Sequence, residues 1–229
     1  MINQKEILSV LLAAITFGYL EAFSLFSWQS WAILSLLGLI IVGVHVFAQK
    51  IVAFSYNSNI ESTLWKMERY GFEKSRYFDF PIPTGLLVPL AALFISFGYF
   101  KILTLMTFEA APLPHKIKPF SHITETQLGI IALSGSVANM LLALITFLLG
   151  FKEFAMFNLY YAFFSLIPFS NLDGMKVLFG SRMLWMFSFF FVLVMIILLE
   201  LAGFWPTLIS AVVIALTILI AYYVSVEAD

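Results

Sequence analysis

The chain has 229 residues, of which 62% are hydrophobic and only 11% are charged, and its mean hydropathy is +1.01. A water-soluble domain carries about 45–50% apolar and about 25% charged residues, so this composition excludes an ordinary soluble protein and predicts a membrane protein. The net charge of −1 gives no electrostatic reason to expect nucleic acid as a partner, and the absence of cysteine excludes disulfides and thiolate metal sites.

Apolar runs follow one another along the chain, and a helix needs about 20 apolar residues to cross a bilayer. The first run follows Lys5 and resembles a signal peptide, but its length and Glu21 favour a retained membrane anchor. The sequence therefore predicts an all-α fold, a polytopic transmembrane helical bundle with six or seven membrane segments in a single domain, residues 1–229. The expected segments are Ile7–Phe26, Trp31–Phe54, Thr84–Phe108, Thr126–Gly150, Phe154–Leu178, Met183–Leu199 and Thr207–Val224.

The connections between these runs carry most of the polar residues. Tyr56–Asp79 is the longest polar stretch, and we expect it to be a cytoplasmic loop because it holds the largest share of Lys and Arg. Thr124–Gln127 fits a capping box and predicts the start of a helix. Two interpretations of Thr84–Phe108, which contains Pro89 and Gly98, stay open: the segment crosses the membrane once, or it enters and returns.

Four ionisable side chains lie within or beside the apolar runs, and such groups are expensive at membrane depth. Glu21 and Glu200 can reach the interface, because their runs can shift by one turn without losing a full span. His45 lies well inside its run, and Gln49 follows four residues later on the same helix face. Two such donors can hold one metal ion or can hydrogen-bond a neighbouring helix. The fourth group is Asp173.

Asp173 lies in an interrupted apolar segment, Ser165–Gly174. Pro168 removes a backbone donor and Gly174 permits a turn, so the helix is expected to break here. Broken backbone is tolerated within a membrane where it is buried in protein or lines a wet cavity. A carboxylate on such a break is a candidate functional group.

Three stretches, in this order, resemble the signatures of the site-2 protease family of intramembrane zinc metalloproteases. His45-Val-Phe-Ala-Gln49 resembles His-Glu-x-x-His, and Gly135-Ser-Val-Ala-Asn139 resembles Gly-Pro-x-x-Asn. Ser165-Leu-Ile-Pro-Phe-Ser-Asn-Leu-Asp-Gly174 resembles Asn-x-x-Pro-x-x-x-Leu-Asp-Gly. The likeness covers about residues 35–180, a site-2-protease-like core, and is closest to the small archaeal members, which lack large extra domains.

The resemblance implies a set of site residues and also shows where this chain departs from the family. In the family, two histidines and the aspartate bind zinc, and the glutamate activates the attacking water. The implied metal ligands are therefore His45, Gln49 and Asp173, with Gln49 in place of the second histidine. Val46 occupies the position of the general base, so no catalytic residue is assigned.

Two further positions are implied to take part in binding. Asn139 retains the family's asparagine, whereas Ser165 replaces another asparagine and Ser136 replaces a proline. The family's active-site helices run parallel, which favours the interpretation that Thr84–Phe108 enters the membrane and returns. The small residues of Gly135–Ala143 are expected to permit close approach of a helix.

Chemistry indicates what these replacements do to the activity. Val46 cannot accept a proton, and losing a positioned general base typically costs about 10²–10⁴ in rate. The amide of Gln49 is a poorer ligand for zinc than imidazole, so zinc is expected to bind weakly or not at all. Whether the protein is an enzyme at all therefore stays open, although the resemblance is to a hydrolase family.

Three hypotheses follow. The leading one is a pseudoprotease: a site-2-protease-like integral membrane protein, in the plasma membrane of a prokaryote, that contacts lipid and binds a transmembrane helix of another protein without cutting it. The second is an active intramembrane zinc metalloprotease with atypical ligands and an unidentified base. The third is an unrelated transporter or structural bundle in which Asp173 lines a pathway.

Overall fold

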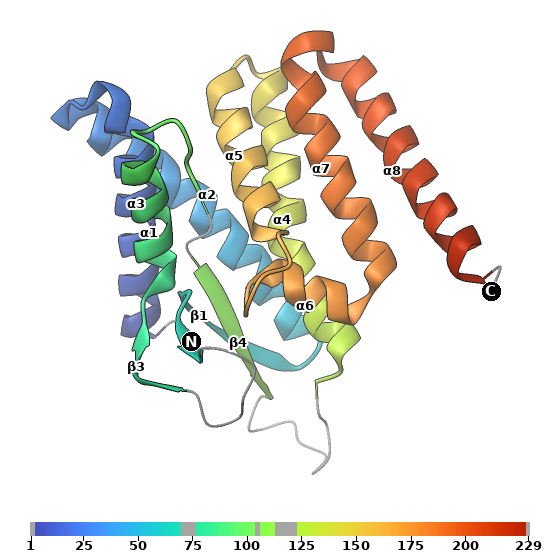
Figure 1. The fold of residues 1–229 in the computed structure, drawn as a ribbon, viewed down its shortest axis with the longest axis horizontal. Helices are drawn as coiled ribbons and strands as arrows, with labels where there is room; N and C mark the ends of the chain where they lie inside the picture. Colours follow the sequence, from blue (N-terminus) through green and yellow to red (C-terminus); the bar gives the residue numbers. More distant parts are fainter. Residues whose placement is uncertain (1–2, 70–76, 104–105, 113–122, 228–229) are drawn as a thin grey trace.

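The computed structural model describes residues 3–69, 77–103, 106–112 and 123–227, and this part of the chain is predominantly α-helical (Figure 1). The expected helical fold is confirmed. Two small two-stranded sheets accompany the helices, and the sequence did not predict them. The elements are α1 Gln4–Ala22, the 3₁₀ turn η1 Phe23–Leu25, α2 Trp28–Ser55, β1 Ser58–Leu64, β2 Met67–Arg69, β3 Tyr77–Ile82, α3 Thr84–Ile95, β4 Met106–Pro112, α4 Glu125–Leu148, α5 Lys152–Ser165, α6 Asp173–Gly180, α7 Arg182–Ala202 and α8 Phe204–Glu227.

Within the described residues, four helices are long and apolar enough to cross a membrane: α2, α4, α7 and α8. The expected number of six or seven membrane segments is not confirmed. The helix α5 has 14 residues, which at 1.5 Å per residue gives about 21 Å, less than the roughly 30 Å thickness of a hydrocarbon core. The helix α1 has 19 residues, but Lys5, Glu6 and Glu21 interrupt its apolar character.

The segment Thr84–Phe108 does not form one long helix. The helix α3 has 12 residues, about 18 Å, and the backbone after it turns back through Phe97 and Gly98, whose φ angles are 51° and 86°. The amide of Gly98 donates to the carbonyl of Leu93 at 2.8 Å and closes this helix end. The chain then returns toward β4 (Figure 1), as the enter-and-return interpretation of this segment expects.

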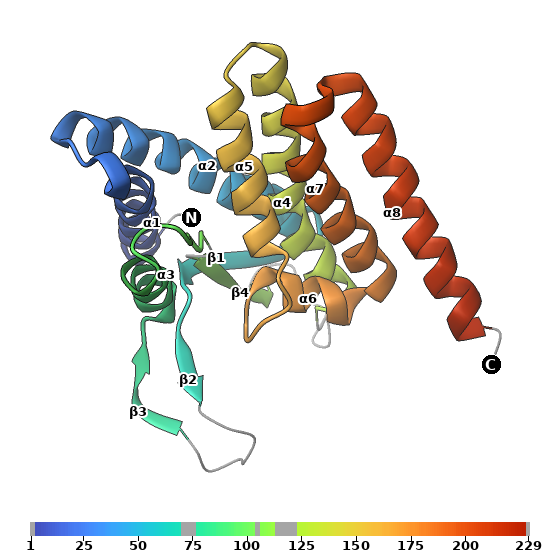
Figure 2. The same ribbon diagram turned by 45° about the horizontal axis from the view of Figure 1, so that its top comes forward.

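The polar stretch Tyr56–Asp79 contains strands rather than only a loop. The strand β1 pairs antiparallel with β4, so that Ser58 lies opposite Pro112 and Leu64 lies opposite Met106. The strands β2 and β3 form a hairpin that projects from the helices (Figure 2). Residues 70–76 of the polar stretch and 113–122 of the connection before α4 lie outside the described residues.

The helices form two groups, and the candidate site lies where the groups meet. Each of the two apolar clusters of the core includes side chains from both groups. The helices α1 and α2 pack along each other with α3 beside α1, whereas α4 to α7 pack together and α8 lies against the outer side of α7 (Figures 1 and 2). Contacts of α2 with α4 join the two groups. The largest fully buried side chains come from both groups: Tyr161, Phe17, Phe108, Leu20, Ile41, Ile60, Leu93, Leu103, Ile131, Leu159 and Leu166.

Candidate functional site

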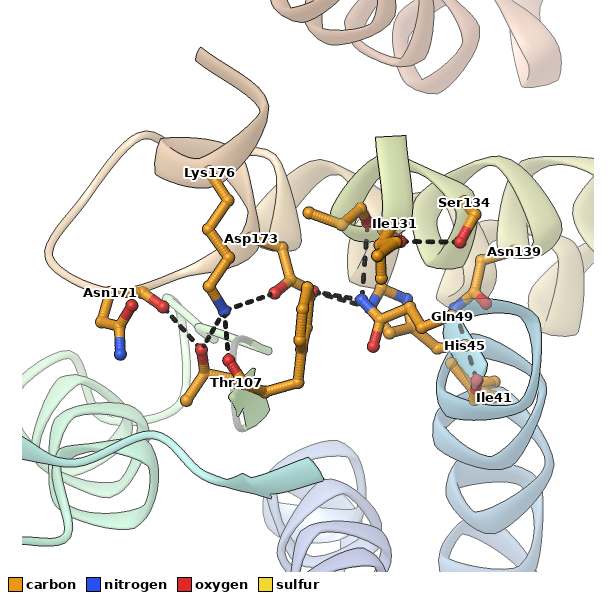
Figure 3. A network of polar contacts seen from close by, with 12 residues as sticks. Ile41, His45, Gln49, Thr107, Ile131, Ser134, Asn139, Asn171, Asp173 and Lys176 are labelled. Atoms are coloured by element: carbon orange, nitrogen blue, oxygen red, sulfur yellow. Dashed lines mark hydrogen bonds and ion pairs between the residues drawn. The ribbon is translucent and has the colours of Figure 1, made fainter. Parts of the chain in front are cut away.

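The helix α2 presents two polar side chains to the interior of the protein. The helix begins after Ser27, whose hydroxyl accepts from the amide of Ser30. His45 and Gln49 lie one turn apart in its second half, and they are 3% and 2% exposed. Their shared face is turned toward α4 and α6 (Figure 3). The predicted spacing on one helix face therefore produces a polar patch that is completely covered by protein.

The break between α5 and α6 brings Asp173 to this patch. The helix α5 ends at Ser165, and α6 begins at Asp173 itself. A Cβ at Gly174 would lie 2.2 Å from the carbonyl oxygen of Leu166, so glycine is required for this close approach. The indole nitrogen of Trp185 donates to the same carbonyl at 2.8 Å and supplies a partner that the broken helix lacks.

The three predicted metal ligands meet at one point. Nε2 of His45 lies 3.0 Å from Oδ2 of Asp173, although the two residues are 128 positions apart in the chain. Nε2 of Gln49 lies 2.7 Å from the same carboxylate oxygen and 3.0 Å from Nε2 of His45. The ring of Tyr161 packs edge-on against the imidazole, with centroids 5.2 Å apart. The structure therefore brings together His45, Gln49 and Asp173.

The hydrogen bonds in this triangle follow from the carboxylate. Oδ2 of Asp173 can only accept, so Gln49 turns its amide nitrogen toward it and His45 donates from a protonated Nε2. The contact between Gln49 and His45 then joins two donors and is not itself a hydrogen bond. Nδ1 of His45 is buried and has no hydrogen-bond partner among the described residues.

A fourth residue, Lys176, belongs to this centre. Its Nζ donates to Oγ1 of Thr107 at 2.8 Å and to the carbonyl oxygen of Phe108 at 2.7 Å, and it lies 3.4 Å from Oδ1 of Asp173 (Figure 3). The same nitrogen lies 3.8 Å from the centroid of the Phe108 ring. None of the three motifs contains this residue. Its position three residues after Asp173 in a helix was the available indication.

The helix α4 contributes close packing rather than a further ligand. A Cβ at Gly135 would lie 2.6 Å from Nε2 of His45, so α4 approaches α2 at this glycine. Asn139 lies one turn later, is fully buried, and donates from Nδ2 to the carbonyl oxygen of Ile41 at 3.4 Å. Gly135 and Asn139 therefore contact α2 of the same chain, and Ser136 and Ala143 of this stretch are also buried.

The remaining predicted positions lie outside the triangle. Val46 is 7% exposed and belongs to the apolar cluster of α1, α2 and α3, with Leu64 and Met106 of the strands. Ser165 is 5% exposed and is the last residue of α5, before the break. Asn139 contacts the backbone of α2 instead of the carboxylate. None of these three supplies a group that could activate water at Asp173.

Glu21 and Glu200 are the other carboxylates within or beside the apolar runs, and they are the remaining candidates for the missing general base. Oε2 of Glu21 is paired with Nζ of Lys101 at 2.8 Å, near the end of α1. Glu200 is exposed near the end of α7. The positions of Glu21 and Glu200 therefore give no support to the idea that either carboxylate replaces the general base missing at Val46.

The donor set does not fit a catalytic zinc site, which normally has three protein ligands and an open position for water. In the described part of the chain no three His, Cys, Asp or Glu side chains cluster in a way that could hold a metal ion. Gln49 presents its amide nitrogen to Asp173, and an amide NH₂ group is a donor that does not bind zinc, so Gln49 does not act as a ligand in this arrangement. The second oxygen of Asp173 already faces the ammonium of Lys176.

The fold and the centre define a helical protein with four helices of membrane-spanning character and a buried ionic cluster. Comparison with protein-family models, curated proteins and solved structures gives no match for this chain. The three sequence motifs and the geometry of the residues in them are therefore the evidence for assigning the chain to a more specific class of protein.

Proposed function

We propose that this chain is a non-cleaving relative of the site-2 proteases that binds a transmembrane segment of another protein. The contact between His45 and Asp173 carries the proposal, because the resemblance requires these two groups to meet and an accidental likeness does not. Gly135, from the second motif, touches the same imidazole. Three motifs that are distant in sequence thus share one centre.

Six helices lie in the membrane under this proposal: the four of spanning character together with α1 and α5. The helix α1 is about 28 Å long and packs closely against α2. The helix α5 packs between α4 and α7, and the broken segment after it extends its path. The many exposed apolar side chains of α7 and α8 would contact lipid, and we place the protein in the plasma membrane of a prokaryote.

The absence of cleavage follows from the environment of the base position. Val46 has no group that can accept a proton, and its side chain belongs to an apolar cluster that also includes Tyr161. Losing a general base typically costs about 10²–10⁴ in rate, and a weak or absent zinc would lower the rate further. The chain therefore keeps the scaffold but not the reactive groups, and binding is the function that remains.

Two hollows beside the returning segment fit a membrane-spanning partner with a polar end. The first has a volume of about 390 Å³ and is lined mainly by aromatic and apolar side chains, including Tyr99, Phe100 and Tyr160. The second has a volume of about 700 Å³ and is lined by Lys66 and Glu68 among other polar residues. An apolar helix that continues into a polar flank matches this order of surfaces.

A transport function has less support from the same geometry. A transporter needs Asp173 to line a wet pathway. Asp173 is 3% exposed, and both of its oxygens face protein donors. A transport assay in proteoliposomes that shows flux abolished by Asp173→Asn would favour that alternative.

The proposal is tested with the full chain in lipid nanodiscs and a set of model transmembrane peptides that carry polar flanks. A photoreactive residue at Tyr160, in the aromatic hollow, should crosslink a peptide, and mass spectrometry should find that peptide uncut. The matched control carries the same residue at Ile209, which is 61% exposed on α8 and away from both hollows. Equal crosslinking at the two positions would overturn the proposal, as would cleavage abolished by Asp173→Asn.

The triple substitution Val46→Glu, Gln49→His and Lys176→Met, which also removes the ammonium that faces Asp173, separates the inactive relative from an active enzyme. If the triple variant gains zinc-dependent cleavage and the natural chain has none, the scaffold is that of the family and its chemistry has been lost. A natural chain that already cleaves, at a rate barely altered by the substitutions, would instead establish the second hypothesis.

A further inference from the structure

The ammonium of Lys176 is the unusual feature of the buried centre. Lys176 is 8% exposed, and burying an ammonium is costly unless it is paired and hydrogen-bonded. Here the requirement is met by three oxygens, from Thr107, Phe108 and Asp173, and by the face of the Phe108 ring. An ammonium has three donors, so its hydrogen-bonding capacity is fully used.

We propose that Lys176 is the resident cation of this centre and takes the place of a bound metal ion. Lys176 is part of α6 and ties this helix to β4 through Thr107 and Phe108, and it faces Asp173 within the same helix. Asp173 in turn accepts from His45 and Gln49 of α2. The ammonium therefore supplies, beside Asp173, the positive charge that a metal ion held between α2 and α6 would otherwise supply.

The charges of the centre agree with this assignment. The single negative charge of Asp173 faces the single positive charge of Lys176, and the amide of Gln49 carries no charge. A divalent ion would add two positive charges beside an ammonium that is already present, within a covered site, and such like charges repel strongly where the dielectric constant is low. Lys176 therefore excludes a divalent metal as well as replacing it.

The first test uses the natural full chain in detergent and needs no partner, so its outcome is separate from the binding of membrane segments. The protein is incubated with zinc or cobalt, dialysed, and analysed for bound metal, and its thermal unfolding is followed with and without a chelator. We expect no stoichiometric metal and an unchanged unfolding temperature. One metal ion per chain, lost on His45→Ala substitution, would overturn the proposal.

The second test removes the ammonium. Lys176→Met should lower the unfolding temperature by roughly 6–20 °C, because it leaves Asp173 buried without its cation. The control is Lys152→Met, which removes an exposed ammonium at the start of α5, and a shift of at most about 2 °C is expected. Equal shifts in the two variants would contradict the assigned role of Lys176.

The third test restores a metal site. Gln49→His supplies a second imidazole, yet Gln49→His alone should not bind cobalt while Lys176 is present. The double variant Gln49→His with Lys176→Met should bind cobalt, with the visible absorption of a tetrahedral complex. Cobalt binding of equal strength in the single and double variants would show that the ammonium does not exclude the metal. If Lys176→Met does not fold, the metal content of the natural chain and of Gln49→His still decides the question.

Discussion

The substitution Gly135→Ala tests the packing of α4 against the imidazole of His45. The added methyl group would lie 2.6–2.7 Å from three atoms of the ring, Nε2, Cδ2 and Cε1, which is closer than carbon contacts in real proteins. The ring cannot turn away freely, because Nε2 is held by Asp173 and the ring packs on Tyr161. Overpacking of this kind typically costs about 1–3 kcal/mol.

The neighbouring helix α2 provides a matched control. Gly43 also lies in a helix, but a Cβ there would meet nothing within 4 Å. Gly43→Ala should therefore stabilise the protein by up to about 1 kcal/mol through helix propensity. For a chain of this size, 1 kcal/mol corresponds to roughly 2–4 °C.

The assay is thermal unfolding in detergent, followed by the fluorescence of the five tryptophans of the chain. Gly135→Ala should lower the unfolding temperature by roughly 2–12 °C, whereas Gly43→Ala should leave it unchanged or raise it slightly. If both variants shift the temperature in the same direction and by the same amount, α4 does not approach His45 as closely as described here, and the assignment of the centre fails with it.

Three further substitutions test the elements that position the site, each by the same unfolding assay. The carboxylate of Glu6 is 4% exposed, and its Oε2 lies 2.7 Å from Nζ of Lys50. Glu6→Gln removes this ion pair and should lower the free energy of unfolding by about 1–3 kcal/mol; an unchanged unfolding temperature would contradict the buried pair. Thr124→Ala removes the capping box of α4 and should cost about 1 kcal/mol, with Ser225→Ala as a control. Trp185→Phe leaves the carbonyl oxygen of Leu166 without its donor and should cost about 1 kcal/mol; an unchanged unfolding temperature would contradict this hydrogen bond.

The helical character of the fold could be predicted from the sequence, because a long apolar run that crosses lipid forms a helix. A backbone in hydrocarbon must satisfy its own hydrogen bonds, and a helix does so within one segment. Thr124–Gln127 marked the beginning of α4 correctly, and the structure has both reciprocal hydrogen bonds of the box. Local rules were sufficient for these elements.

The strands and the number of spans were not readable in the same way. The strand β1 contains Ser58, Asn59, Glu61 and Ser62, a composition that reads as a polar loop, and its partner β4 comes from an apolar run more than 40 residues later. A strand pair of this kind is stabilised by contacts across the sheet, which no local pattern contains. Hydropathy also did not show that the chain turns back after α3, and four of the described helices are long and apolar enough to cross a membrane.

The sequence predicted His45, Gln49 and Asp173 as parts of the site but not Lys176, which supplies the positive charge of the centre. His45 and Asp173 attract notice because an ionisable group in an apolar run needs a partner, whereas Lys176, in a short helix after a break, looks like an ordinary interfacial charge. The carboxylate of Asp173 shows that Lys176 is not an ordinary interfacial charge, because the two charges compensate each other inside the protein. Its deletion would leave Lys176 as an uncompensated buried cation, and deletion of Lys176 would leave Asp173 as an uncompensated buried anion, so each residue makes the other tolerable inside the protein. Asp173 therefore has a cation of the chain itself beside it, since the ammonium of Lys176 faces Oδ1 while Oδ2 accepts from His45 and Gln49.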